Sequence, residues 1–212
     1  MNPDNEDEAH PTVVYIVDDD PELLESVSWL LGSIGIDSVP LDSAQAFLDT
    51  YDGNHPALLI LDVRMPVMSG TRLQEILNDE LPWVAVIFVS AHGDIKMSVR
   101  TMRRGAIDFL EKPYESQHML DVVQSGIRTA AERFTEFRDR QDVQAKLDTL
   151  TPREKEILRL VVEGLPSQNI ARRLEMSVKT VDVHRARIKA KTEADSINTL
   201  VRDILRYGAD LD

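Results

Sequence analysis

Short runs of apolar residues alternate with amphipathic stretches along residues 12–127. Four consecutive apolar residues, 58–61, are typical of a strand buried on both faces. After residue 21, apolar positions recur at helical spacing until the glycines at 32 and 35. Strands are predicted at 12–17, 36–39, 58–61, 84–89 and 106–110, and helices at 21–32, 43–50, 70–78, 94–104 and from 115 onward. This alternation predicts an α/β domain whose five-stranded parallel sheet is covered on both faces.

The pattern remains helical from residue 122 to about 147, but it is charged on most sides. Such a stretch is too polar for a core helix, so we interpret it as an extension of the last helix that connects two domains. A flexible linker is the alternative. It is disfavoured because the stretch contains no proline and no glycine after Gly126.

A second, all-helical domain is predicted from residue 149. Thr151, Pro152 and Glu154 have the pattern of a helix start, with a capping residue, a proline in the first turn and a glutamate three positions on. This helix should run to residue 162, and further helices are predicted at 166–174, 178–191 and 196–207. A short helix, a tight turn at 175–177 and a longer basic helix are typical of a helix-turn-helix.

Charge divides the chain in the same way. The net charge of −13 is unusual for a nucleic-acid-binding protein. However, residues 1–148 contain 12 Lys and Arg against 27 Asp and Glu, whereas residues 149–212 contain 12 against 10. Residues 177–191 contain five basic side chains and one acidic side chain. We therefore expect two domains with different partners, of which the second binds nucleic acid.

Composition excludes several other classes of protein. The chain has no cysteine, which excludes disulfides and thiolate chemistry and fits a cytoplasmic protein. It has no apolar run long enough to span a bilayer, so no membrane association is expected. Residues 1–11 are polar and acidic, so we expect a disordered tail rather than a secretory signal.

Polar side chains follow several of the predicted strands. Asp62 ends the third strand, and Asp18 and Asp19 follow the first. Ser90 and Lys112 follow the fourth and fifth. Because open parallel sheets bind ligands at the carboxyl ends of their strands, these side chains should form one site. Individually, each has a plain structural alternative: a turn or cap for Asp62 and Ser90, and an ion pair with a structural acid for Lys112.

Such a cluster suits phosphoryl transfer to a carboxylate. The reaction needs an oxygen nucleophile, for which Asp62 is the candidate, and a divalent cation, for which Asp18, Asp19 and Asp62 offer oxygen ligands. It also needs positive or hydrogen-bonding groups around the phosphoryl oxygens, which Lys112 and Ser90 can provide. No glycine-rich nucleotide loop and no histidine pair at zinc-ligand spacing occur in the sequence. Direct use of ATP and histidine-based zinc chemistry are therefore not expected.

Several motifs together resemble a two-component response regulator. They are Asp18-Asp19, residues 61–70 (LDVRMPVMSG), residues 90–94 (SAHGD), residues 105–113 (GAIDFLEKP), residues 150–154 (LTPRE) and residues 177–185 (SVKTVDVHR). The front half is similar to a CheY-like receiver domain and the back half to a LuxR-type helix-turn-helix domain, as in the FixJ-like branch. The resemblance implies a flavodoxin-like receiver at 12–127, a helical linker at 128–148 and a DNA-binding domain at 149–212.

The resemblance also implies roles for individual residues in the receiver. Asp62 would be the phosphorylated residue. Asp19 would bind Mg²⁺ directly, Asp18 through water, and Arg64 through its main-chain carbonyl. Ser90 and Phe109 would form the switch that couples phosphorylation to the fourth helix. Dimerisation would then use a face of that helix containing Ile95, Val99, Met102 and Arg103.

In the second domain, the resemblance assigns DNA contacts to the basic helix. They are Lys179, Thr180, Asp182, Val183, Arg185, Arg187, Lys189 and, at the end of the helix, Lys191. A basic helix can also be an ordinary solvated surface, and the helix-turn-helix context argues against that. Two positions depart from the family pattern. Asp182 replaces a frequent lysine and could accept a hydrogen bond from cytosine, and Ser167-Gln168 replaces a frequent Asn-Lys.

The sequence therefore predicts a phosphorylation-activated transcription regulator of a bacterial two-component system. The expected partners are a sensor histidine kinase, double-stranded DNA and a second copy of the chain, with RNA polymerase as a further candidate. Apart from Mg²⁺-dependent phosphoryl transfer to and from its own Asp62, no enzymatic activity is expected. The rival functions are an aspartyl-phosphate phosphatase or transferase, for which no segment could form a substrate cap, and a relay module that does not bind DNA.

Overall fold

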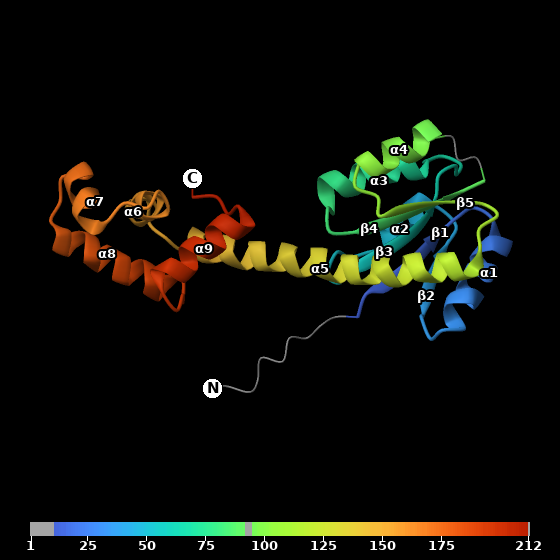
Figure 1. Cartoon of the computed structure of the whole chain (residues 1–212), viewed down its shortest axis with the longest axis horizontal. Coiled ribbons are helices and arrows are strands. Elements are labelled where there is room, and N and C mark those ends of the chain that lie inside the picture. The colour runs from blue at the N-terminus through green and yellow to red at the C-terminus, as the bar shows by residue number, and fades with distance from the viewer. Residues whose placement is uncertain (1–10, 92–94, 212) are drawn as a thin grey trace. The chain divides into compact units, whose positions relative to one another are not determined.

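The computed structural model describes residues 11–91 and 95–211. The chain forms two compact units, one ending at Thr135 and the other beginning at Glu136 (Figure 1). In the first unit, five parallel strands lie in the order β2-β1-β3-β4-β5, which confirms the predicted flavodoxin-like sheet. The strands are β1 (Val13–Val17), β2 (Ser38–Leu41), β3 (Ala57–Asp62), β4 (Ala85–Ser90) and β5 (Asp108–Glu111). The helices are α1 (Pro21–Gly32), α2 (Ala44–Thr50), α3 (Gly70–Glu80), α4 (Ile95–Arg103) and the first part of α5 (Ser116–Asp148).

Two predictions lie partly outside the described residues. These are the disordered tail at 1–11, of which only Pro11 is described, and the first residue of the predicted helix at 94–104. No helix within the two described ranges is long and apolar enough to cross a membrane.

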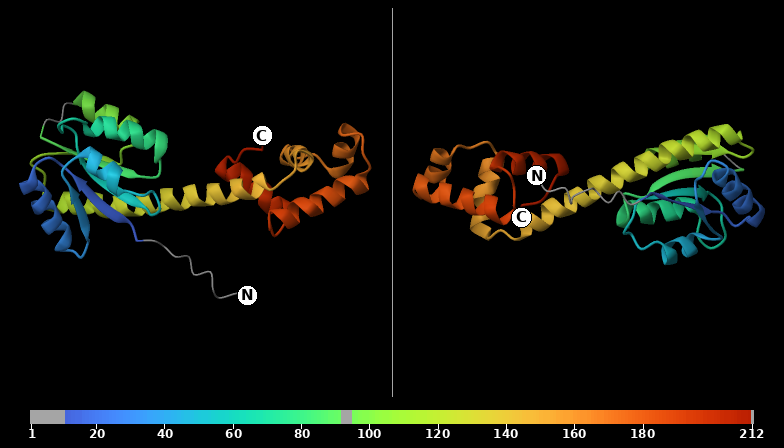
Figure 2. Two further views of the ribbon diagram at one scale, coloured as in Figure 1. Left: turned by 180° about the vertical axis from the view of Figure 1, so that it is seen from behind. Right: turned by 90° about the horizontal axis from the view of Figure 1, so that it is seen from below.

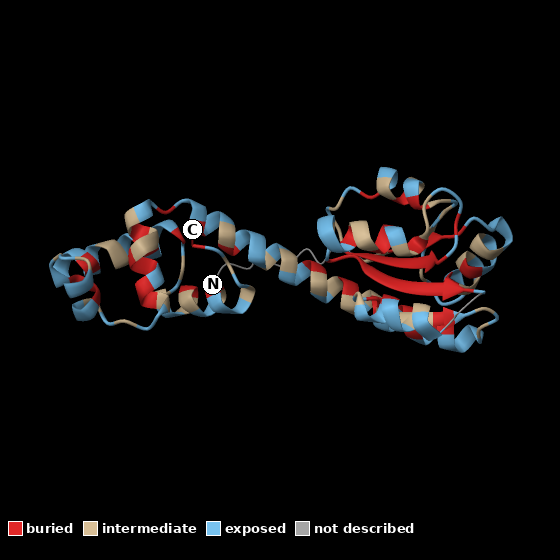
Figure 3. Ribbon diagram, turned by 90° about the horizontal axis from the view of Figure 1, so that it is seen from above, coloured by how far each residue is buried: buried red, intermediate tan, exposed pale blue. Residues whose placement is uncertain are grey.

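The core of the first unit lies on both faces of the sheet. Every residue of β3 and β4 is buried, which accounts for their uninterrupted apolar sequences (Figure 3). On one face, side chains such as Ile60 and Ile87 pack against α1 and α5. Helices α3 and α4 cover the opposite face (Figure 1 and the left view of Figure 2). The central strands therefore place their carboxyl ends at one edge of a rigid layer.

Strands β2 and β5 both begin two residues later than predicted. The amide of Ile36 donates to the carbonyl of Leu31, 3.1 Å away, across Gly35 in the left-handed conformation. In the same way, the amide of Ala106 donates to the carbonyl of Thr101 in α4, across Gly105 in the left-handed conformation. In both places the first apolar residue after the glycine completes the end of the preceding helix, so it is not free to begin the strand.

The second unit is entirely helical, as predicted. It contains α6 (Pro152–Val162), α7 (Ser167–Arg173), α8 (Val178–Lys191) and α9 (Ile197–Tyr207). The predicted connector at 128–148 is helical, as part of the single helix α5. Its last turns belong to the second unit, because Val143 and Leu147 join the core formed with α6, α8 and α9. The division between the two units therefore lies inside the predicted connector.

Hydrogen bonds from side chains define the starts of several helices. Thr151 and Glu154 form the predicted capping box of α6. Ser177 caps α8 by accepting from the amide of Thr180 at 3.0 Å. Asp20 caps α1 by accepting from two amides at the start of that helix. These caps fix the residues at which α1, α6 and α8 begin.

Candidate functional site

The polar side chains predicted at the strand ends meet in one cleft at the carboxyl edge of the sheet. Asp62 is the last residue of β3 and Ser90 the last residue of β4, whereas Asp18 and Lys112 directly follow β1 and β5. The cleft has a volume of about 260 Å³. Its lining comprises all the predicted residues, Asp18, Asp19, Asp62, Arg64, Ser90 and Lys112, together with Asp20 and Ala91. Asp20 and Ala91 are not among the predicted site residues. Their positions next to Asp19 and Ser90 in the sequence were the only available signal.

Lys112 joins the two buried carboxylates of the cleft. Its Nζ atom donates to Oδ2 of Asp18 at 2.7 Å and to Oδ1 of Asp62 at 3.0 Å. The main-chain amide of Lys112 donates to the carbonyl of Ser90 at 2.9 Å, which fixes the start of this side chain next to β4. The positive charge of Lys112 is therefore already placed where a phosphoryl group on Asp62 would need it.

Asp62 lies in an environment that increases the basicity of its carboxylate. Only 7% of the residue is exposed, and burial raises its pKa above the ordinary value. Hydrogen bonds from Lys112 and from the amide of Arg64, at 2.6 Å, oppose this rise without cancelling it. Burial alone would lower the pKa of Lys112, but its bonds to Asp18 and Asp62 outweigh that effect and raise it. The pair thus combines a firmly protonated lysine with a more basic, and hence more nucleophilic, carboxylate.

The cleft contains the type of ligand that Mg²⁺ prefers, but its carboxylates are not grouped around a common point. Its carboxylates are hard oxygen ligands of the kind that this ion prefers. Among the residues described, however, no three His, Cys, Asp or Glu side chains are grouped so that they could hold a metal ion. One oxygen of Asp18 accepts from Lys112 and the other from the amide of Asp20. A cation would therefore compete with Lys112 for Asp18 and Asp62.

Gly70 maintains the close approach of α3 to the end of β3. A Cβ atom at this position would lie 2.1 Å from the carbonyl oxygen of Asp62. We expect Gly70→Ala to lower the free energy of unfolding of the first unit by about 3 kcal/mol, because the clash is with backbone.

Gly32→Ala is the matched control for Gly70→Ala. A Cβ atom at Gly32 meets nothing within 4 Å, so this variant should gain about 0.5 kcal/mol. Urea denaturation followed by tryptophan fluorescence measures both variants, since Trp29 and Trp83 both lie in the first unit. Equal stability of Gly70→Ala and the parent protein would contradict the predicted contact.

The two predicted switch residues lie on neighbouring strands. Ser90 is buried at the cleft, and Phe109, on β5, is half-buried with its ring centroid 6.4 Å from that of Phe88 on β4. The predicted dimer residues lie on the surface of α4, where Ile95, Val99 and Met102 are 82%, 45% and 41% exposed. Arg103 is also exposed. Their roles in switching and dimerisation remain predictions.

In the second unit, α7, the turn at 174–177 and α8 form the predicted helix-turn-helix. Val181 and Ile188 anchor α8 to the core. Seven of the predicted DNA-binding residues are exposed, and Arg185 is half-buried; the seven are Lys179, Thr180, Asp182, Val183, Arg187, Lys189 and Lys191. Lys191 differs from the others, because its Nζ donates to Oε2 of the buried Glu154 at 2.7 Å. It holds the end of α8 against the start of α6, a role that the sequence did not suggest.

Comparisons with known proteins agree with both halves of this description. Residues 14–124 match the family described as response regulator receiver domain, and residues 148–203 match the family described as bacterial regulatory proteins, luxR family. The transcriptional regulatory protein FixJ of Bradyrhizobium diazoefficiens is 34% identical over 92% of this chain and 95% of its own length. The transcriptional regulatory protein TdiR of Thauera aromatica is 38% identical over 93% of this chain and 87% of its own length.

Solved structures give the same result. The response regulator StyR matches with a TM-score of 0.75 and 38% identity, over 93% of this chain and 100% of that one. Full-length FixJ from B. japonicum matches with a TM-score of 0.53 and 34% identity, over 92% of this chain and 97% of that one. These likenesses extend over both units and agree with the resemblance seen in the sequence motifs. The chain therefore belongs to the response regulators that combine a receiver domain with a LuxR-family regulatory domain.

Proposed function

We propose that this protein is a DNA-binding transcription regulator that is activated when a sensor histidine kinase phosphorylates Asp62. The observation that carries the proposal is the contact of Lys112 with both Asp18 and Asp62 in the cleft at the strand ends. A lysine between two buried acids offsets part of their negative charge before reaction and remains available to a phosphoryl group afterwards. The exposed basic residues of α8 provide the output surface.

In the proposed reaction, an oxygen of Asp62 attacks the phosphorus atom of a phosphohistidine. The P–N bond breaks, the histidine nitrogen keeps the electron pair and takes up a proton, and an acyl phosphate forms on Asp62. Lys112 then exchanges its contact with the Asp62 carboxylate for one with a phosphoryl oxygen, while the Ser90 hydroxyl turns toward another.

Receiver domains generally bind Mg²⁺ at their acidic pocket. Here Asp18, Asp19, Asp62 and the carbonyl of Arg64 would hold the ion, which would neutralise negative charge on the phosphoryl oxygens. Asp19 is exposed and needs no rearrangement of the core to reach a cation. Asp18 and Asp62 would share their charge between the ion and Lys112.

Phosphorylation would favour dimerisation through α4. We expect Val99→Asp to abolish the concentration-dependent shift from monomer to dimer while phosphorylation of Asp62 continues, because a charge would be buried in an apolar contact. The helix should stay folded, since Gln74 and Asn78 of α3 donate to carbonyls at its C-terminal end at 3.0 and 2.9 Å. Sedimentation velocity after treatment with acetyl phosphate measures the effect. A variant that still dimerises would place the interface on another surface.

DNA binding would depend on the exposed basic residues of α8. Lys189→Ala should weaken binding to any double-stranded DNA and reduce the slope of log affinity against log salt by about 0.9, because one phosphate contact is lost. Arg185→Ala is a second test on the same face of the helix. Arg202→Ala, an exposed arginine of α9 that pairs with Asp203, is the control and should leave the slope unchanged. Fluorescence anisotropy with non-specific DNA measures all three variants; unchanged slopes for both Lys189→Ala and Arg185→Ala would refute the assignment to α8.

The base preference would depend on Asp182 and Val183, whose short exposed side chains lie near the start of α8. A dimer would present two such helices, so the operator should be an approximate inverted repeat with half-sites about one helical turn apart. Selection of genomic fragments by the protein, with and without acetyl phosphate and Mg²⁺, tests the whole proposal. The phosphorylated protein should enrich specific fragments much more strongly than the unphosphorylated protein does. Contact with RNA polymerase would follow at the promoters selected in this way.

The rival functions predict different results. A relay module would accept a phosphoryl group but select no DNA. A phosphatase or transferase would consume phosphorylated substrates in multiple turnovers. Retention of one phosphoryl group per chain together with specific DNA binding would exclude both rivals.

A further inference from the structure

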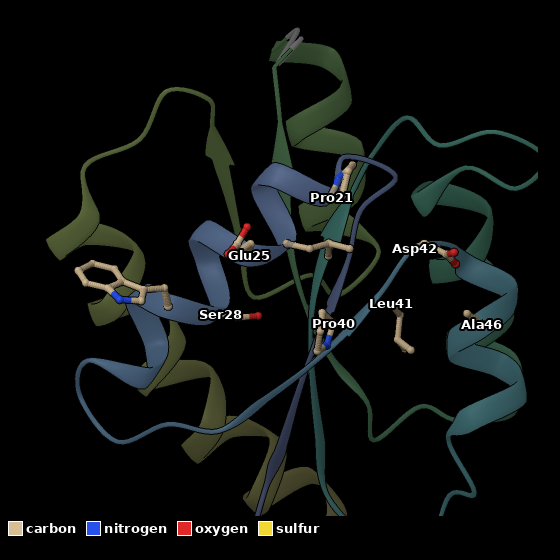
Figure 4. Close-up of a pocket in the computed structure, with 9 residues that line it drawn as sticks. Pro21, Glu25, Ser28, Pro40, Leu41, Asp42 and Ala46 are labelled. Carbon is tan, nitrogen blue, oxygen red and sulfur yellow. The ribbon is translucent and has the colours of Figure 1, made fainter.

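An open groove crosses the edge of the sheet in the first unit, between α1 and α2. We call it the α1–α2 groove. Its volume is about 850 Å³. Figure 4 shows Pro21, Glu25 and Ser28 on α1, Asp42 and Ala46 at the start of α2, and Pro40 and Leu41 of β2 between them. The apolar part of its lining consists of Pro21, Leu24, Trp29, Pro40, Leu41 and Ala46.

Trp29 is the unusual residue of the groove. Its side chain does not belong to the hydrophobic core, and 76% of the residue is exposed. A large aromatic side chain at the edge of an apolar groove is typical of a protein interface, where tryptophan often contributes much of the binding energy. In the isolated chain this apolar area remains in contact with water, so a partner that covers it gains from the hydrophobic effect.

The segment that forms the groove carries charges of only one sign. Residues 11–63 contain ten Asp and Glu but no Lys and no Arg. Eight of these ten acids are exposed, and none of the eight forms an ion pair with a lysine or arginine in the described part of the chain. Glu25 and Asp42 line opposite walls of the groove itself. The occupant should therefore be positively charged.

The shape of the sheet edge favours a helix as the occupant. Strand β2 lies at the edge of the sheet, but it has only four residues. One of them, Pro40, has no amide hydrogen to donate to an added strand. Strand addition is therefore disfavoured, whereas an apolar groove flanked by two helices can accept the apolar face of a third.

We propose that the α1–α2 groove binds a basic amphipathic helix of a partner protein. Bulky apolar side chains of that helix would cover Trp29, Leu24 and Leu41, and its lysines or arginines would pair with Glu25 and Asp42. DNA cannot take this place, because its charge has the same sign as the surface. A second copy using the same groove would bring two acidic surfaces together. This site is separate from the cleft at Asp62 and does not depend on phosphorylation.

Trp29 provides a direct reporter for the test. The probe is a synthetic helix of leucine and lysine with all leucines on one face, added to the full chain at about 0.15 M salt, where charges more than about 8 Å apart are largely screened. Because Trp83 is already buried, a blue shift of the fluorescence should report the burial of Trp29. Trp29→Phe should abolish the shift. A peptide of the same composition in scrambled order should bind at least about tenfold more weakly, since it lacks the apolar face.

Matched charge reversals separate groove binding from general attraction. Glu25→Lys with Asp42→Lys should weaken binding at least about tenfold. Asp37→Lys with Asp49→Lys changes the charge by the same amount at exposed sites outside the groove, and it should have little effect. Circular dichroism checks that each variant is folded. Equal losses in the two double variants, or equal binding of the scrambled peptide, would overturn the proposal. A blue shift that appears when the protein is concentrated without peptide would also overturn it, since the occupant would then be a second copy.

Discussion

Asp62→Asn should gain no phosphoryl group from acetyl phosphate and Mg²⁺, whereas the parent protein should gain one. The amide cannot attack phosphorus as a carboxylate does, and the other buried acid of the cleft, Asp18, has both oxygens engaged with Lys112 and the amide of Asp20. Intact-mass spectrometry measures the result directly. Because Asp62 is buried next to Lys112, the neutral amide should be tolerated in the fold, which circular dichroism checks.

Asp20→Asn is the matched control for this experiment. Asp20 lines the same cleft, but its side chain caps α1, and asparagine is an equally good cap. The control should therefore be labelled like the parent protein. Labelling of Asp62→Asn to the same extent as the parent would show that another residue accepts the phosphoryl group. Loss of labelling in Asp20→Asn would show that the cleft responds to any change of charge rather than to the loss of one nucleophile.

Glu154→Gln should destabilise the second unit by about 2 kcal/mol at neutral pH. Glu154 is buried and accepts hydrogen bonds from Lys191 and from both the amide and the hydroxyl of Thr151. Burial alone would raise its pKa, but these bonds lower the pKa from 4.5 to about 2. Such a shift corresponds to about 3 kcal/mol, and we reduce this to about 2 because the Lys191 side chain is 38% exposed and partly screened by water.

The contribution of Glu154 to stability should depend on pH. The pKa of Glu154 is lower in the folded state than in the unfolded state, so its contribution to stability is complete above about pH 4.5. It should be lost as the pH falls toward 2. In Glu154→Gln this contribution is absent at every pH, so the difference between variant and parent should shrink across that range. Urea denaturation followed by circular dichroism is required, because both tryptophans lie in the first unit.

Glu156→Gln is the control for Glu154→Gln. Glu156 pairs with Arg153 on the surface of α6, and exposed pairs of this kind contribute less than about 1 kcal/mol. Equal stability of Glu154→Gln and the parent would contradict this prediction. It would show that water satisfies Lys191 and Thr151 as well as the Glu154 carboxylate does. Lys191 would then be available to DNA, as the sequence suggested.

The sequence by itself determined the order and type of the elements and the location of the cleft. Apolar runs such as 58–61 are typical of buried strands, and each of the acid, hydroxyl and lysine positions could be identified because it lies at the end of a strand or directly after one. Parallel strands bring their carboxyl ends to one edge wherever they lie in the chain, so Asp18, Asp62, Ser90 and Lys112 could be grouped without knowing any distance. Local spacing was sufficient because these features depend on periodicity alone.

Only the tertiary structure decided what depends on contacts between distant residues. It paired Lys112 with both Asp18 and Asp62 and directed Lys191 to a glutamate 37 residues earlier. It assigned Ile36 and Ala106 to helix ends, because hydrogen bonds across left-handed glycines compete with strand formation. It also left Trp29 exposed beside an acidic groove, although this residue lies within a regular amphipathic helix pattern. A side chain's charge and periodicity are local properties, whereas its burial and its partners are decided by which elements pack against it.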